Sequence, residues 1–202
     1  MIKSLSVKYL FWITLISPRE TLLVVVPVSW REKLGLVHIY TGDGKGKTTA
    51  ALGLALRMLG SGGRVIIIQF MKAPGVYGEY HMAERCGFRI ESYGPPKFVH
   101  GRPEPDDIEA AKRALERAKE VVASGEWDLV ILDEICVALG FGMLDVEEVE
   151  ALITKKASNT ELVLTGRYCP EELFELADYV TEMREIKHPY HRGITARKGV
   201  EY

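Results

Sequence analysis

The stretch TGDGKGKTTAALG, Thr41 to Gly53, mixes glycines and lysines before paired threonines and an alanine- and leucine-rich run. The preceding residues 35–41, GLVHIYT, form a short β-rich apolar run. Residues 48–60, TTAALGLALRMLG, are strong helix formers and end in glycine, a usual helix stop. A glycine-rich loop between a strand and a helix is the setting of a phosphate-binding loop.

The residue types in this loop suit an anion. Gly42, Gly44 and Gly46 permit a backbone whose successive N–H groups point inward. The helix N-terminus at Lys47 and Thr48 adds partial positive charge and free donors. We expect Lys47 to reach terminal phosphates and Thr48 to place its hydroxyl on a magnesium ion.

The loop departs from the common phosphate-loop pattern in two ways. The spacing G-x-x-x-x-G-K-T would require glycine where this chain has Thr41, so the loop is one residue shorter and begins at Gly42. A second lysine, Lys45, lies inside it. The sequence therefore predicts phosphate binding but leaves the orientation of the phosphates open.

A pair of acids, Asp133 and Glu134, ends the apolar run WDLVILDE. Ligands of parallel sheets bind at the carboxyl ends of the strands, where this pair is expected. One carboxylate could bind or orient magnesium while the other holds the first in place. The alternative is a pair of surface acids at a strand end.

Further strands and helices alternate along the chain. A continuous β-branched run indicates a strand buried on both faces, and an apolar stripe with three- and four-residue spacing indicates a helix over 106–125 with a solvated charged face. Asp145 and Glu148 predict a capping box before another helix. The fold class is therefore α/β, a single P-loop NTPase-like domain with a mainly parallel sheet flanked by helices. The expected strands cover residues 35–41, 64–70, 88–93, 127–134, 160–166 and parts of 179–188.

The composition is that of an ordinary globular chain: 202 residues, 47% hydrophobic, 27% charged, formal net charge -2. This charge argues against a nucleic-acid-coating protein. The 3 cysteines form no C-x-x-C pair, which favours reduced thiols in a cytoplasmic protein. A guanine-reading N-K-x-D motif is absent, because the single asparagine is Asn159, and this argues against GTP hydrolysis.

Residues 1–33 are unlike the domain expected over 34–202. Apolar runs at 9–16 and 22–28 are broken by Pro18 and Pro27, and neither run reaches the roughly 20 residues of a membrane helix. We expect no stable membrane insertion. Three interpretations stay open: a weak anchor, a flexible arm, or an extension from a misplaced translation start, of which we favour the last two.

Several motifs together resemble the P-loop type of ATP:corrinoid adenosyltransferase, the cob(I)alamin or cob(I)yrinic acid a,c-diamide adenosyltransferases. The similarity runs from about Gly35 to Tyr202. The combination is far more specific than a phosphate loop alone. It comprises TGDGKGKTTAALGLALR, IIIQFMK, WDLVILDE, LTGRYCPEELFELADYVTEM and IKHPYHRGITARKGVEY.

The resemblance implies a reaction in cobalamin biosynthesis or salvage. The Co(I) centre of a reduced corrinoid attacks the ribose C5′ of ATP, takes the 5′-deoxyadenosyl group and releases triphosphate. Co(I) is itself a strong nucleophile, so such a site needs positioning and charge stabilisation rather than a general base. The implied partners are ATP, the corrinoid, magnesium or manganese, and a reductase or flavodoxin-like electron donor. The family is usually a cytoplasmic homodimer whose N-terminal arm helps cover the corrinoid, which would give residues 30–33 a purpose.

The resemblance also implies roles for residues. Lys45 and Lys47 would neutralise the triphosphate, Thr48 and Glu134 would bind the metal, and Asp133 would support them. Thr49 and Arg57 would add contacts to ATP. The whole ATP-binding set is Gly42, Asp43, Gly44, Lys45, Gly46, Lys47, Thr48, Thr49 and Arg57.

Other positions of these motifs are open candidates. Gln69, Lys72 and Arg167 follow strand ends and are either cleft residues or structural loop residues. Tyr77, Tyr80 and His81 lie in a region that could touch the corrinoid, although no spacing singles them out.

A loop at residues 97–105, KFVHGRPEP, departs from the family. Relatives often carry F-x-W there, in a loop thought to displace the lower axial ligand of the corrinoid. Phe98 matches the first aromatic residue and is expected to fill the vacated volume. His100 replaces the tryptophan, and we expect it to pack beside Phe98 rather than coordinate cobalt, because coordination would restore the displaced ligand.

Two other functions are compatible with the residues alone. A P-loop ATPase or small-molecule kinase would release ADP, whereas adenosyl transfer releases triphosphate. A non-catalytic, nucleotide-dependent corrinoid carrier would bind corrinoid without consuming ATP.

Overall fold

The computed structural model describes residues 28–95 and 101–202, and in them the predicted α/β class is confirmed. The six strands form one sheet in the order β3-β2-β4-β5-β1-β6, and all of the neighbouring pairs are parallel. Their bounds are β1 Val37–Thr41, β2 Val65–Gln69, β3 Arg89–Ser92, β4 Leu129–Asp133, β5 Glu161–Thr165 and β6 Tyr179–Glu182.

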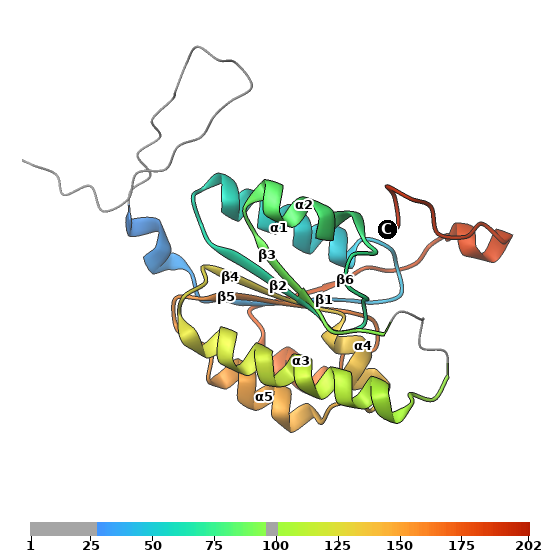
Figure 1. The fold of residues 1–202 in the computed structure, drawn as a ribbon. Coiled ribbons are helices and arrows are strands. Elements are labelled where there is room, and N and C mark those ends of the chain that lie inside the picture. The colour runs from blue at the N-terminus through green and yellow to red at the C-terminus, as the bar shows by residue number, and fades with distance from the viewer. Residues whose placement is uncertain (1–27, 96–100) are drawn as a thin grey trace, which may run out of the picture.

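Helices cover both faces of the sheet (Figure 1). On one face lie α1, Lys47–Gly60, and α2, Gly78–Cys86; on the other lie α3, Pro105–Ser124, and α5, Val146–Thr154. A short helix that the sequence did not predict, α4 Ile135–Gly140, follows β4 directly. Three 3-10 turns complete the described elements: η1 Val28–Lys33, η2 Glu171–Leu176 and η3 Pro189–Arg192.

The central strands are buried along their whole length. In β2, β4 and β5 every residue is buried, as expected for parallel strands covered by helices on both faces. One core cluster fills the space under α3 and α5, and a second contains Ala51, Ala55 and Met58 of α1. This packing holds the strand ends, and the loops that follow them, in fixed positions.

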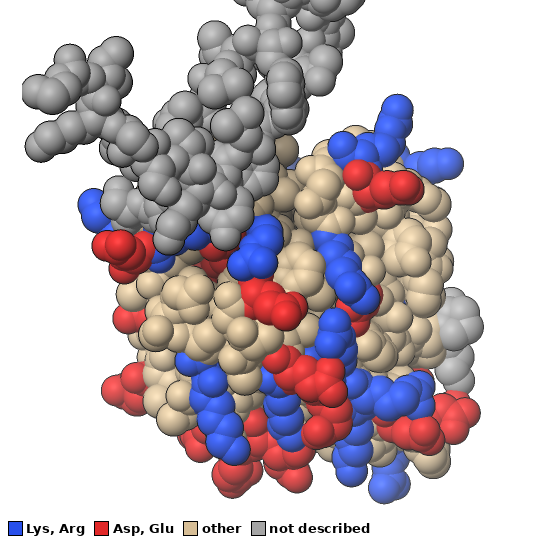
Figure 2. Space-filling view, turned by 60° about the vertical axis from the view of Figure 1, so that its left-hand side comes forward, with Lys and Arg blue, Asp and Glu red and all other residues tan. Residues whose placement is uncertain are grey.

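The predicted amphipathic helix is confirmed as α3. Ala111, Leu115, Ala118 and Val122 are buried against the sheet, while the outer face carries ion pairs such as Arg113–Glu109. Figure 2 shows positive and negative side chains interspersed over the lower part of the molecule, where this helix layer lies. The charge run is therefore a solvated face.

The predicted capping box before α5 does not form. Asp145 is the N-cap residue of α5, but its side chain makes no capping hydrogen bond. The Glu148 carboxylate instead accepts a bond of 2.9 Å from Lys119 Nζ of α3. A tertiary ion pair between two helices has replaced the local contact.

Residues 30 and 31 are fastened to the amino-terminal edge of the sheet. Arg31 Nε donates to Asp128 Oδ1 at 2.8 Å, directly before β4, and Arg31 Nη2 donates to the Gly62 carbonyl at 2.7 Å, shortly before β2. Trp30 packs against the α1 side of the core. Within one chain these residues lie at the end of the sheet opposite the phosphate loop, so they do not cover the carboxyl ends of its own strands.

No helix long and apolar enough to cross a membrane occurs in the two described ranges. The three cysteines Cys86, Cys136 and Cys169 are all free thiols.

Candidate active site

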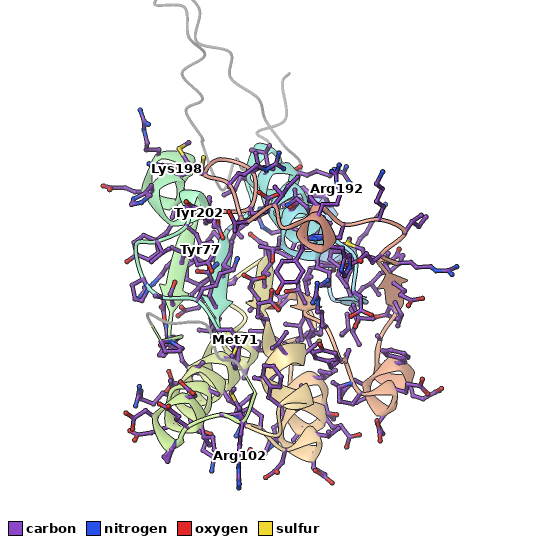
Figure 3. The ribbon with its side chains drawn as sticks, turned by 90° about the vertical axis from the view of Figure 1, so that its right-hand side faces the viewer. Met71, Tyr77, Arg102, Arg192, Lys198 and Tyr202 are labelled. Atoms are coloured by element: carbon purple, nitrogen blue, oxygen red, sulfur yellow. The ribbon has the colours of Figure 1, made fainter. Side chains whose placement is uncertain are left out.

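A cavity of about 760 Å³ opens at the carboxyl edge of the sheet, within the range of about 300–1,000 Å³ usual for ligand sites. The loop that follows β1 forms one side, and the residues after β2, β4 and β5 form the others. Figure 3 looks onto this edge, where Tyr77, Met71 and Tyr202 of the lining come from separate segments. The lining comprises Gly44–Thr49, Leu52, Met71, Lys72, Tyr77, Gly78, Glu79, Glu134, Val137, Phe141, Arg167, Tyr168, His188 and Gly199–Tyr202.

The glycines of the loop are required by conformation and by space. Gly42 and Gly46 have φ of 94° and 125°, which residues with a side chain rarely adopt. A Cβ at Gly44 would lie 2.5 Å from the Met183 carbonyl oxygen. The Gly44 N–H donates to that same carbonyl, which directly follows β6, so it points away from the inward set of donors that the sequence suggested.

Lys47 lies under the loop, and its position is defined by hydrogen bonds. Its Nζ donates to the carbonyl oxygens of Gly42 at 2.6 Å and Gly44 at 2.7 Å. Burial lowers the pKa of Lys47 from its ordinary value, although the nearby Glu134 carboxylate acts in the opposite direction. Lys45 is exposed, and its Nζ donates to the Val200 carbonyl at 3.1 Å.

Thr48 and Asp133 are joined across the sheet. The Thr48 hydroxyl donates to Asp133 Oδ1 at 2.8 Å, and the Thr165 hydroxyl of the intervening strand β5 donates to the same oxygen at 2.8 Å. The other oxygen, Oδ2, receives Lys72 Nζ at 2.9 Å and Gln69 Nε2 at 3.2 Å. Burial alone would raise the pKa of Asp133, but Lys72 and these hydroxyl donors hold it below its usual value.

Glu134 differs sharply from its neighbour. It has a left-handed backbone, φ 65°, uncommon for a residue with a side chain, and its N–H donates to Thr165 Oγ1 at 3.0 Å. The residue belongs to the lining of the cavity. Burial and then the charge of Asp133 raise the pKa of Glu134 to about 7, although Lys72, Lys47 and Arg167 oppose the shift.

The oxygen atoms of Thr48 and Glu134 would fit a magnesium ion that also binds phosphate. Thr48 gives its proton to Asp133, which leaves the hydroxyl lone pairs for a cation, and Glu134 supplies a carboxylate at the same cavity. Both are hard oxygen ligands, as Mg²⁺ prefers. Among the described residues no group of three or more His, Cys, Asp or Glu forms a metal cage. Mg²⁺ sites commonly use one or two protein ligands and complete the shell with phosphate and water.

The remaining candidates are distributed unevenly. Thr49 lines the cavity, and Arg167 both lines it and donates to the Asp43 carbonyl at 3.0 Å. Arg57 is exposed further along α1, outside the lining. Neither Tyr80 nor His81 belongs to the lining, whereas Tyr77 does. Phe98 and His100 lie outside the described residues.

The C-terminal segment is the part of the cavity that sequence reasoning did not place. His188 and residues 199–202 line the cavity, although they are remote in sequence from the phosphate loop. Phe141 and Tyr168 add an aromatic wall, with ring centroids 6.1 Å apart. The motif GVEY at the end of the chain contributed to the family resemblance, but it did not predict that these residues lie at the cavity.

A cavity of this kind could serve adenosyl transfer, phosphoryl transfer or non-catalytic binding. Comparison with known protein families distinguishes these possibilities. Residues 33–202 match the model of the family described as ATP:corrinoid adenosyltransferase BtuR/CobO/CobP. The chain belongs to this family. The match spans both the phosphate loop and the C-terminal wall, so the whole cavity lies inside it.

Individual relatives agree with this assignment. A corrinoid adenosyltransferase of Escherichia coli K12 is 33% identical over 174 residues, which cover 85% of this chain and 88% of the relative. One from a Sinorhizobium species is 38% identical over 177 residues, covering 85% and 82%. The corrinoid adenosyltransferase CobA of Salmonella typhimurium is 31% identical over 172 residues, covering 85% and 88%.

Proposed function

We infer that the protein transfers the 5′-deoxyadenosyl group of ATP to the Co(I) centre of a corrinoid and releases inorganic triphosphate. The observation that carries this inference is one cavity in which a phosphate loop, with Lys45 and Lys47, faces Glu134 at the end of β4, in a chain of the adenosyltransferase family. The alternatives of an ATPase, a kinase or a non-catalytic carrier are not favoured by this family.

The reaction matches the chemistry that the cavity offers. Co(I) donates an electron pair to C5′ of the ribose, the C5′–O bond breaks, and its electron pair leaves on the triphosphate. The step transfers no proton from the substrate, so the protein's task is to place C5′ beside cobalt and to stabilise the leaving charge. Lys45, Lys47 and Arg167 supply positive charge around the loop.

We propose that Thr48 and Glu134 hold Mg²⁺ or Mn²⁺, with Asp133 orienting Thr48. The ion, when bound, would neutralise part of the charge on the triphosphate. Thr48 supports this role because its proton is committed to Asp133 Oδ1. The remaining members of the proposed ATP-binding set are Gly42, Asp43, Gly44, Gly46, Thr49 and Arg57, of which exposed Arg57 has the least support from its position.

The corrinoid would lie on the apolar side of the cavity. Met71, Phe141 and Tyr168 offer nonpolar surface there, and the C-terminal segment closes it. Phe98 and His100 stay proposals as corrinoid contacts, with Phe98 as the apolar wedge.

Further proposals concern the whole protein. We propose a cytoplasmic homodimer that receives electrons for Co(II) reduction from a reductase or flavodoxin-like protein. We also propose that the adenosyltransferase domain covers 34–202 and that 1–33 are an N-terminal extension or arm. Arg31, near the end of that extension, is ion-paired to Asp128, so the end of the extension lies against the domain.

A spectroscopic assay tests the function. The protein is incubated without oxygen with ATP, Mg²⁺ and a chemically reduced corrinoid, and the absorbance change of cobalt–carbon bond formation is followed. We expect a protein-dependent change that requires ATP. Corrinoid binding without any adenosylated product would instead indicate a carrier.

A further inference from the structure

Lys72 lies just beyond β2, in a position where it contacts two acids from different elements. Its Nζ is 2.9 Å from Asp133 Oδ2 of β4 and 2.9 Å from Glu79 Oε1 of α2. The side chain is only 11% exposed, and its ammonium group lies 4.5 Å from the ring centroid of Tyr77. A lysine held by two carboxylates and an aromatic face has little freedom to move.

Gln69 joins the same hydrogen-bonding network as Lys72 and bridges the same two acids. Gln69 Nε2 donates to the same two carboxylate oxygens, Glu79 Oε1 and Asp133 Oδ2, at 3.2 Å each, and Ser92 Oγ of β3 donates to Gln69 Oε1 at 2.8 Å. The neutral amide of Gln69 can satisfy hydrogen bonds but cannot balance two negative charges. Lys72 is therefore the member of the network whose charge keeps both carboxylates in place.

The network reaches Thr48 through the Asp133 carboxylate. With Oδ2 held by Lys72 and Gln69, the plane of this carboxylate is fixed, and Oδ1 is aimed at the Thr48 hydroxyl 2.8 Å away. The direction of the Thr48 lone pairs toward the cavity depends on that bond. Replacing Lys72 should therefore alter the orientation of the Thr48 hydroxyl, and the effect is transmitted through Asp133.

Lys72 also connects this carboxylate to a wall of the cavity. Tyr77, Gly78 and Glu79, at the start of α2, line the cavity beside Lys72. Glu79 and Tyr77 both contact Lys72, so the beginning of α2 is fastened to the end of β4. One cation thus fixes both a cavity wall and the residue that orients Thr48.

We propose that Lys72 is a positioning residue for adenosyl transfer: it holds Asp133 toward Thr48 and fixes the α2 wall without contacting the reacting atoms. The proposal rests on the proposed function and on Thr48 as a metal ligand. It differs from a direct phosphate contact, which a lysine at a cavity surface could also make. The two roles separate experimentally, because positioning acts through the metal and a phosphate contact does not.

The test is ATP binding by calorimetry at stepped Mg²⁺ concentrations, together with kcat. For Lys72→Met we expect the half-saturating Mg²⁺ to rise about 10- to 100-fold, the range seen when groups behind metal ligands are removed. ATP affinity without Mg²⁺ should change less than about twofold. We expect kcat to fall by a factor similar to the rise in half-saturating Mg²⁺.

Lys156→Met is the matched control. Lys156 is another partly buried lysine whose Nζ makes hydrogen bonds, to the carbonyls of Gly35, Ala157 and Thr160, but it lies near the start of β5 and β1 rather than at the cavity. It should lose stability while keeping the wild-type Mg²⁺ dependence. If Lys156→Met raised the half-saturating Mg²⁺ concentration as much as Lys72→Met does, general destabilisation would explain both results. That outcome would overturn the proposal.

Lys72→Arg keeps the test decisive if Lys72→Met does not fold. The guanidinium retains the charge but cannot reproduce the geometry of the ammonium, so an intermediate rise of about three- to tenfold is expected. An unchanged Mg²⁺ requirement in a folded variant, or a loss of ATP affinity without Mg²⁺, would contradict positioning. Failure of the wild-type protein to adenosylate corrinoid would count against the proposed function alone, since the Mg²⁺-dependent binding is measured independently.

Discussion

Asp133 already receives two contacts at each carboxylate oxygen from within the protein. Thr48 and Thr165 donate to Oδ1, and Lys72 and Gln69 donate to Oδ2. A carboxylate with its lone pairs used in this way is suited to orienting a ligand rather than to being one. The sequence motif predicted an acidic pair at a strand end. The pattern by itself left open which carboxylate binds the metal, because the donors to Asp133 come from other parts of the chain, including Thr165 of β5 and Gln69 of β2. The division into Glu134 as ligand and Asp133 as support came only from the family resemblance.

Removing the Lys47 side chain tests the phosphate loop at the residue scale. Lys47→Ala should reduce kcat about 100-fold or more, because charge stabilisation of the leaving group is lost. The fold should remain, as judged by circular dichroism. Lys112→Ala, on the exposed face of α3, is the control and should retain full activity. Near-normal turnover by a folded Lys47→Ala would remove Lys47 from the reaction.

Glu134 predicts a pH dependence of metal binding. Its pKa is raised from 4.5 to about 7, so below that pH the carboxyl keeps its proton and competes with the metal. Raising the pH from 6 to 8 should therefore lower the half-saturating Mg²⁺ concentration by about tenfold, since the proton is lost in this window.

The control for that pH dependence is Glu134→Gln. This variant has no carboxyl group to titrate and should need more Mg²⁺ at pH 8, with a nearly flat profile between pH 6 and pH 8. Mg²⁺ titrations of ATP binding at fixed ionic strength would measure both proteins. The same slope in both would mean that another group titrates.

At the scale of elements, the phosphate loop is shaped by β6 as well as by its own sequence. The Met183 carbonyl accepts the Gly44 N–H and occupies the space that a Cβ at Gly44 would need. Sequence patterns identified the loop because glycine spacing is local information. They did not show this contact, because Met183 is far away along the chain.

Two glycine substitutions separate this tertiary constraint from local propensity. Gly44→Ala places a Cβ 2.5 Å from a backbone oxygen and should lower the unfolding free energy by about 1–3 kcal/mol. Gly53→Ala, in α1 with nothing within 4 Å of the added Cβ, should raise it by about 1 kcal/mol. Denaturant titrations would measure both. Equal effects would show that the loop does not depend on the contact with β6.

The elements that were missed or altered have physical explanations. Helix α4 covers only Ile135–Gly140, too short for an apolar period to be recognised. The capping box at Asp145 failed because Lys119 of α3 offers Glu148 an opposite charge. Long, continuous strands such as β2 and β4 were predicted well, since burial on both faces leaves a strong apolar signal.

At the scale of the whole molecule, the amino-terminal edge of the sheet holds the N-terminal turn, and the carboxyl edge carries the candidate site. Arg31 and Asp128 fasten the N-terminal turn at one end, while the loop, the acidic pair and the C-terminal segment meet at the other. The α/β class followed from the order of elements. That residues 199–202 return to the phosphate loop, where Lys45 donates to Val200, could not be predicted from local patterns.

The identity of the phosphate product tests the central claim most directly. The protein, ATP, Mg²⁺ and excess reduced corrinoid are allowed to react, and the phosphorus species are resolved by nuclear magnetic resonance. Attack at C5′ predicts one inorganic triphosphate for each adenosylcorrinoid formed, with no ADP. ADP and phosphate in place of triphosphate would contradict adenosyl transfer and would assign the cavity to phosphoryl chemistry.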